Sequence, residues 1–180
     1  MAVLDVLRLG HPVLRNKSKE IPPVDVGRES LQTLIDDMVH TLREYDGVGL
    51  AAPQVGEPVR LVVMECRENP RYPDTPEIPL TILINPVIRF LSQDKVTGWE
   101  GCLSVPSLRG RVSRYRELVV EALDRAGRPV KFPARDFFAV VAQHEVDHLD
   151  GVLFFDRMTS LETLTFTDEF KRYWAKDEEQ

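Results

Sequence analysis

Apolar residues recur at helical spacing in three parts of the chain. Residues Glu29 to Leu42 carry leucine, isoleucine, methionine and valine at intervals of three and four, which predicts an amphipathic helix. A second helix is predicted with one face formed by Phe137, Val140, Val141, His144 and His148. Asp136 is expected as its N-cap and Gly151 as its C′ residue. From Ser160 to Gln180, a third helix is predicted by aromatic residues at fourfold spacing, namely Phe166, Phe170 and Trp174.

Short apolar runs of a different kind lie between the first two helices. They predict strands, namely VRLVVM from Val59, TILIN from Thr81, LVVEAL from Leu118 and the following PVKF. The segment Arg67 to Pro79 holds four prolines and mixed charges, which predicts a surface loop. Helices and strands in this order favour an α+β fold, and a length of 180 residues without internal repeats predicts one domain spanning 1–180.

Composition and charge exclude several classes of protein. The chain is 43% hydrophobic and 29% charged, as globular proteins are, and its net charge of -6 argues against nucleic-acid binding. No apolar stretch approaches the roughly 20 residues that span a bilayer, and the N-terminus MAVLDVLRLG lacks the features of a signal peptide. We therefore expect a cytoplasmic protein without membrane contact. Cys66 and Cys102 alone form no disulfide framework, so each is a candidate ligand or a small apolar residue.

The segment QHEVDHLDG, Gln143 to Gly151, carries the strongest chemical signal. His144 and His148 lie four residues apart on one helix, so both imidazoles can bind the same metal ion. Glu145 completes an H-E-x-x-H pattern and is adjacent to a ligand without being one. The alternative is that both histidines belong to the core and bond to backbone groups.

The segment WEGCLSVP, Trp99 to Pro106, offers a third metal ligand in Cys102. A thiolate with two imidazoles suits a divalent transition metal and leaves one position open for water. Taken alone, Cys102 could equally be a buried thiol. Two other classes of protein stay open at this point: a zinc peptidase with a different third ligand, and a structural metal site in which Cys66 is the only spare thiol.

The segment GVGLAAPQ, Gly47 to Gln54, has side chains too small to build a core. Such a run lets two backbones pack closely or lets a ligand lie along the backbone. A peptide could pair with this segment as a strand does, with Gly47 and Gly49 leaving it room. The simpler reading is that both glycines serve a tight turn.

GVGLAAPQ, EGCLS and QHEVDHLDG together, in this order, closely resemble the three motifs of peptide deformylase. The resemblance implies a metallohydrolase that removes the formyl group from the N-terminal formyl-methionine of new polypeptides and releases formate. It implies a central metal-binding helix packed against antiparallel sheets. The resemblance also implies one divalent metal ion held by Cys102, His144 and His148, usually Fe²⁺, with Zn²⁺, Ni²⁺ or Co²⁺ able to substitute.

The resemblance also assigns roles to single residues. It implies that the Gln54 side-chain amide and the Leu103 backbone N–H donate to the oxyanion of the tetrahedral intermediate. The residues that it implies for substrate binding are Val48, Gly49, Gly101, Arg109 and Val140. A bound metal lowers the pKa of a water molecule, and Glu145 is expected to act as general acid and base, first taking the proton and then giving it to the leaving amine.

Some features of the sequence depart from the family pattern. Ser107 stands where many members have glycine, and Asp46, where a glutamate is common, is expected to pair with Arg109. The remaining arginines nearby are expected to form a solvated strand edge, namely Arg111, Arg114 and Arg116. Some bacterial deformylases are thought to dock on the ribosome through a basic C-terminal helix, but this chain ends KDEEQ. We therefore do not expect this chain to dock through a basic helix, and a contact with the ribosome by another surface stays an open alternative.

Overall fold

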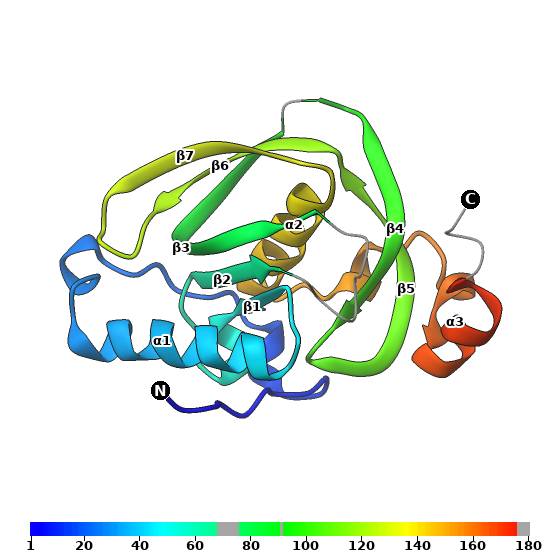
Figure 1. Cartoon of the computed structure of the whole chain (residues 1–180), viewed down its shortest axis with the longest axis horizontal. Helices are drawn as coiled ribbons and strands as arrows, with labels where there is room; N and C mark the ends of the chain where they lie inside the picture. The colour runs from blue at the N-terminus through cyan, green and yellow to red at the C-terminus, as the bar shows by residue number, and fades with distance from the viewer. Residues whose placement is uncertain (68–75, 91, 176–180) are drawn as a thin grey trace.

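A five-stranded antiparallel sheet forms the larger part of the fold (Figure 1). The computed structural model describes residues 1–67, 76–90 and 92–175. In spatial order, the strands of this sheet are β1 (Gly49–Ala51), β2 (Leu61–Cys66), β3 (Ile78–Phe90), β6 (Glu117–Leu123) and β7 (Pro129–Arg135). Each strand pairs antiparallel with its neighbour, so β1 forms one edge of the sheet.

A second, three-stranded sheet stands beside the first. It consists of β4 (Lys95–Cys102), β5 (Val105–Tyr115) and β8 (Thr165–Phe166), in that order. β4 and β5 form a long hairpin, and β8 adds two residues to the far side of β5. β4 is therefore an edge strand, as β1 is in the other sheet.

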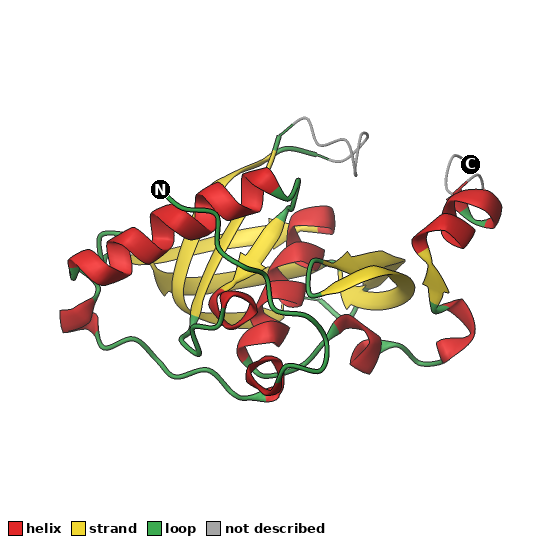
Figure 2. Cartoon of the chain, turned by 90° about the horizontal axis from the view of Figure 1, so that it is seen from below, coloured by secondary structure: helices red, strands yellow, loops and turns green. Residues whose placement is uncertain are grey.

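Two helices cover opposite faces of the five-stranded sheet. Leu61 and Val63 of β2 pack in one core cluster with the apolar face of α1 (Glu29–Glu44), whereas Val62 and Met64 pack in another with α2 (Asp136–Leu149). Figure 2 shows α1, the long helix beside the N-terminus, lying across the sheet. Since successive strand residues point to opposite faces, a continuous apolar run such as LVVM is what a strand covered on both sides requires.

These elements confirm the α+β fold with a central helix, antiparallel sheets, an N-terminal helix and a C-terminal helix. All four predicted strands are present, and β3 begins earlier than expected, at Ile78. The predicted loop Arg67 to Pro79 therefore ends too late, because Ile78 and Pro79 already belong to β3. Residues 68–75 of this loop lie outside the described residues. β1, β4, β5 and β8 were not predicted from periodicity, because glycines and outward-facing charges interrupt the apolar pattern of β4 and β5, and β1 and β8 are only three and two residues long.

The ends of α2 match the prediction only in part. Gly151 has a φ of 73°, as a C′ glycine does, but the N-cap is Arg135 rather than Asp136. Asp136 is the first helical residue, with a φ of 48°, and its carboxylate accepts a hydrogen bond from Arg116 at 2.9 Å. Ser107, where the family often has glycine, likewise has a positive φ of 65°, which explains why glycine suits that position.

The C-terminal helix begins later than predicted, and residues 176–180 of the predicted helix lie outside the described residues. α3 spans Thr167–Tyr173, and Phe166 precedes it as an exposed residue of β8. Phe170 and Trp174 do pack against the rest of the chain, as expected from the aromatic stripe. Among the residues that the structure describes, no helix combines the length and the apolar character needed to cross a bilayer.

Candidate active site

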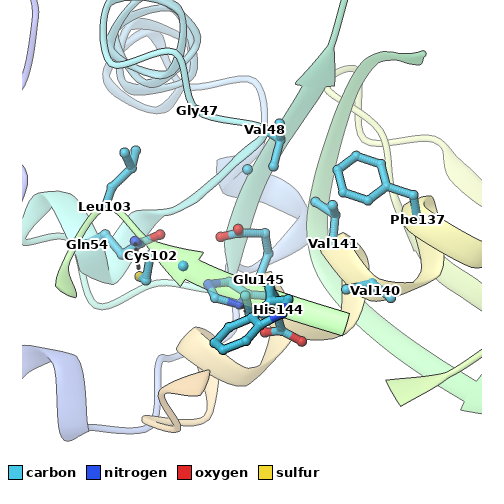
Figure 3. Close-up of a pocket in the computed structure, with 14 residues that line it drawn as sticks. Gly47, Val48, Gln54, Cys102, Leu103, Phe137, Val140, Val141, His144 and Glu145 are labelled. Carbon is cyan, nitrogen blue, oxygen red and sulfur yellow. Dashed lines mark hydrogen bonds and ion pairs between the residues drawn. The ribbon is translucent and has the colours of Figure 1, made fainter. Parts of the chain in front are cut away.

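One pocket lies between the edge strands β1 and β4 and is closed at its base by α2 (Figure 3). Its empty volume is about 540 Å³, including the part open to solvent. The three motifs of the sequence meet here, because the GVGLAAPQ segment forms β1 and the turn after it, EGCLS ends β4, and QHEVDHLDG ends α2. The predicted site residues that line the pocket are Val48, Gly49, Gln54, Gly101, Cys102, Leu103, Val140, His144 and Glu145.

Cys102, His144 and His148 bring their ligand atoms within 4.8 Å of one another. Cys102 is the last residue of β4, while the two histidines lie one turn apart on α2. The Cys102 Sγ is 3.3 Å from the His148 Nε2, and all three side chains are at most 10% exposed. A thiolate and two imidazoles so close together fit a tetrahedral site for a divalent transition metal with one open position. Cys66, at the end of β2, is not part of this group.

Glu100 fixes the orientation of the His144 ring. The His144 Nδ1–H donates to the Glu100 Oε2 at 2.8 Å, which leaves the other ring nitrogen as the metal ligand. Burial raises the pKa of Glu100, but the hydrogen bonds from His144 and Arg114 outweigh burial and lower the pKa to about 2. Glu100 is therefore ionised at neutral pH and orients the imidazole through the ring nitrogen that does not face the metal-ligand group.

The prediction that Arg114 belongs to a solvated strand edge is wrong. The Arg114 side chain is only 5% exposed and donates to both oxygens of Glu100, at 2.8 and 3.0 Å, and to Asp147 at 2.5 Å. Asp147 also accepts hydrogen bonds from Arg157. Arg114 shares the inward face of β5 with Val112, whereas Arg111 and Arg116 are exposed as predicted. A buried ion-pair network thus supports the metal-ligand group.

Glu145 is the buried carboxylate of the pocket. Its side chain rises from α2 toward β1, between Gln54 and Cys102 on one side and the apolar side chains of the pocket on the other (Figure 3). Burial raises the pKa of Glu145 to about 7. Its Oε2 is buried and makes no hydrogen bond to any described residue, so a water or substrate group is needed to satisfy it.

Gly49 of β1 and Gly47, which lies two residues earlier, make room for side chains of the protein itself. A Cβ at Gly49 would overlap the Glu145 carboxylate and lie 2.6 Å from its Cγ and Cδ. A Cβ at Gly47 would lie 2.7 Å from the Leu42 Cδ1. These glycines were predicted to admit a peptide, but the space beside the Gly49 Cα is already filled by Glu145.

Gln54 is held with its amide nitrogen toward the metal-ligand group. Its Oε1 accepts a hydrogen bond from the Ala51 N–H at 2.8 Å, which turns the amide group inward. Its Nε2 then lies 3.2 Å from the Ser104 Oγ and 3.5 Å from the Cys102 Sγ. Gln54 is buried and lines the pocket, so its amide nitrogen is held beside the metal-ligand group.

An apolar side of the pocket is formed by α2 and β1. It contains Val48, Phe137, Val140 and Val141, which Figure 3 shows on the side of Glu145 away from Gln54. Arg109 does not line the pocket, although it pairs with Gly101 across the β4–β5 hairpin. Trp99 and Glu100 also line the pocket, although no role was predicted for either. Glu100 is the first residue of the EGC motif and Trp99 directly precedes it, and that position was the available signal.

An α+β fold that brings a cysteine and two histidines together at a pocket that also holds a buried glutamate is typical of a metal-dependent hydrolase. The comparisons with known proteins name the family. The family model described as polypeptide deformylase matches residues 3–164. The chain belongs to the peptide deformylase family, whose members are enzymes that remove the formyl group from N-terminal methionine.

Relatives and solved structures agree with this assignment. The chain is 46% identical over 172 residues to peptide deformylase 1 of Prochlorococcus marinus, covering 95% of this chain and 88% of that protein. It is also 46% identical to peptide deformylase 2 of a Nostoc species, covering 97% of each. A class I type b peptide deformylase from Acinetobacter baumannii, crystallised with Met-Ala-Ser bound, has a TM-score of 0.84 and 39% identity, covering 87% of this chain and 99% of that one.

Proposed function

We propose that this enzyme deformylates nascent peptides with Glu145 as general acid and base and with a single metal ion held by Cys102, His144 and His148. The observation that carries the proposal is the group of three ligand atoms within 4.8 Å of one another beside a buried carboxylate. Fe²⁺ is the proposed ion on the resemblance of the motifs, since ligand chemistry alone favours later metals. When bound, a divalent ion would polarise both water and the formyl oxygen.

Glu145 moves the proton in this proposal. Its ionised form accepts a proton from the attacking water, and its protonated form then gives that proton to the departing amine. Burial supports both steps, because a pKa raised to about 7 lets the carboxyl group exist in either form near neutral pH. The proposed donors to the developing oxyanion are the Gln54 Nε2 and the Leu103 backbone N–H.

The peptide is proposed to bind as an extended strand between β1 and β4. Both are edge strands, and both line the pocket. The methionine side chain is assigned to the apolar side of the pocket, formed by Val48 and Val140 with their neighbours, while the backbones of Gly49 and Gly101 flank the peptide. The Acinetobacter baumannii structure with Met-Ala-Ser supports a peptide ligand of this kind.

The remaining assignments of the sequence analysis stay predictions. They are a single domain over 1–180, a cytoplasmic location, the pairing of Asp46 with Arg109, and the position of Arg109 near the substrate entrance. A ribosome contact is not part of the proposal.

The experiment that tests the proposal is anaerobic purification, metal analysis and a formate-release assay with formyl-Met-Ala-Ser. Cleavage of an internal peptide bond, without formate release, would instead identify a zinc peptidase.

Replacing Cys102 by alanine is expected to reduce the metal bound per chain and formate release together, because one of three protein ligands is lost. Metal analysis after dialysis against a weak chelator measures the first effect. Cys66→Ala is the matched control, since Cys66 is also buried but lies outside the ligand group. Equal metal loss in both variants would show that the cysteines act through folding rather than ligation.

Replacing Gly49 by alanine is expected to lower kcat by about ten- to a hundredfold with unchanged metal content. The added methyl group displaces the Glu145 carboxylate, and small misplacements of catalytic groups have effects of this size. Steady-state kinetics with formyl-Met-Ala-Ser separates kcat from KM. Gly98→Ala is the control, because a Cβ at Gly98 meets nothing within 4 Å. A raised KM with wild-type kcat would show that the glycine serves the peptide instead.

A further inference from the structure

The C-terminal segment Thr165–Trp174, which contains β8 and α3, packs on the outer face of the β4–β5 hairpin (Figure 1). The segment follows residues 3–164, which the family model matches, so membership of the family does not give this segment a function. On the hairpin, Glu100 and Cys102 point inward to the metal-ligand group, whereas Trp99 and Gly101 alternate with them. The segment therefore covers the side of β4 opposite to the ligands.

Trp99 connects this segment to the pocket. Trp99 is one of the residues that line the pocket, and its ring contacts two aromatic residues of the segment. The ring centroid of Phe170 is 4.9 Å from that of Trp99 in an edge-on arrangement, and the centroid of Trp174 is 5.6 Å away. Aromatic pairs at these distances favour particular ring orientations. The C-terminal segment thus contacts a residue that lines the pocket.

Arg109 makes a second connection. Its backbone pairs with Gly101 on one side and with Thr165 of β8 on the other. Its guanidinium carbon lies over the Phe170 ring, 5.1 Å from the centroid, which is within the range of cation–π attraction. Phe170 therefore contacts both Trp99, in the pocket wall, and Arg109, beside it.

We propose that the C-terminal segment is a specificity-determining part of the substrate-binding site, which positions Trp99 and Arg109 to contact peptide residues beyond the formylated methionine. The proposal rests on the proposed binding of an extended peptide between β1 and β4. Such a peptide, with its first residue at Cys102, passes Gly101 and reaches Trp99 after about 10 Å, the length of three extended residues. Phe170 and Trp174 are positioning residues in this scheme, because they act through Trp99 and Arg109.

The test compares two substrates, formyl-methionine amide, which has no residue beyond the methionine, and formyl-Met-Ala-Ser-Ala, on Phe170→Ala and Trp174→Ala enzymes. We expect KM for the longer peptide to rise about fivefold or more with unchanged kcat, and both constants for the shorter peptide to stay within about twofold. Tyr173→Ala is the control, since Tyr173 lies on the same helix and is 63% exposed. Equal changes for both peptides, or no change for either, would overturn the proposal.

Two further measurements keep the outcome decisive. If an alanine variant does not fold, Phe170→Leu retains the apolar bulk and removes the ring that Arg109 and Trp99 contact. If the wild-type enzyme releases no formate from either peptide, the proposed function fails, and calorimetric binding of Met-Ala-Ser-Ala to wild-type and Phe170→Leu proteins tests the segment separately. Equal affinities of the two proteins for this peptide would refute the role of the segment.

Discussion

Replacing Glu145 by alanine is expected to lower kcat by about a thousandfold while the enzyme keeps its metal. The expected loss is large because, among the residues that the structure describes, the pocket is lined by one further carboxylate, Glu100, which is engaged by His144 and Arg114. The metal is retained because the ligand atoms belong to Cys102 and the two histidines. Formate release and metal content, measured on one preparation, give both values.

Glu145→Asp is the matched variant for this prediction. It keeps a carboxylate on α2 but shortens the side chain, so it should recover part of the lost activity if proton transfer is the task of this residue. Full activity of Glu145→Ala would contradict the proposed mechanism. Loss of metal from Glu145→Ala would show that the residue supports the site structurally.

The metal-ligand group could be predicted from the sequence because its signals are local. Histidines four residues apart on an apolar helical face point the same way, whatever the rest of the fold does. Cys102 and Gln54 are far from them in the chain, and only the resemblance of three motifs joined them to one site. The structure brings Cys102 within 3.3 Å of His148 and turns the amide nitrogen of Gln54 toward Cys102.

The parts that sequence reasoning missed depend on contacts between distant segments. Arg114 looked solvated because its strand carries three arginines, and its burial follows only once Glu100 and Asp147 approach it from 14 and 33 residues away. The reason for a glycine at position 49 was missed in the same way. The neighbour that fills its Cβ space, Glu145, belongs to another motif.

Replacing Arg114 by methionine is expected to destabilise the protein by about 3–5 kcal/mol, the usual effect of removing one partner from a buried ion-pair network. Methionine fills similar space but leaves the Glu100 and Asp147 carboxylates buried without their shared cation. Urea unfolding of the metal-free protein measures this change. Arg111→Met is the matched control, because Arg111 lies on the exposed face of the same strand and should change stability by no more than about 0.5 kcal/mol.

The same substitution should also weaken metal binding about ten- to a hundredfold, as loss of groups that orient a ligand commonly does. Arg114 donates two hydrogen bonds to Glu100, and Glu100 in turn accepts the one from the His144 Nδ1–H. Without the guanidinium, the pKa of Glu100 rises because burial is no longer opposed by that partner, and a protonated Glu100 holds the imidazole less firmly. Competition with a metal indicator measures the affinity. If stability fell while metal affinity stayed at the wild-type value, the network would stabilise the fold without orienting His144.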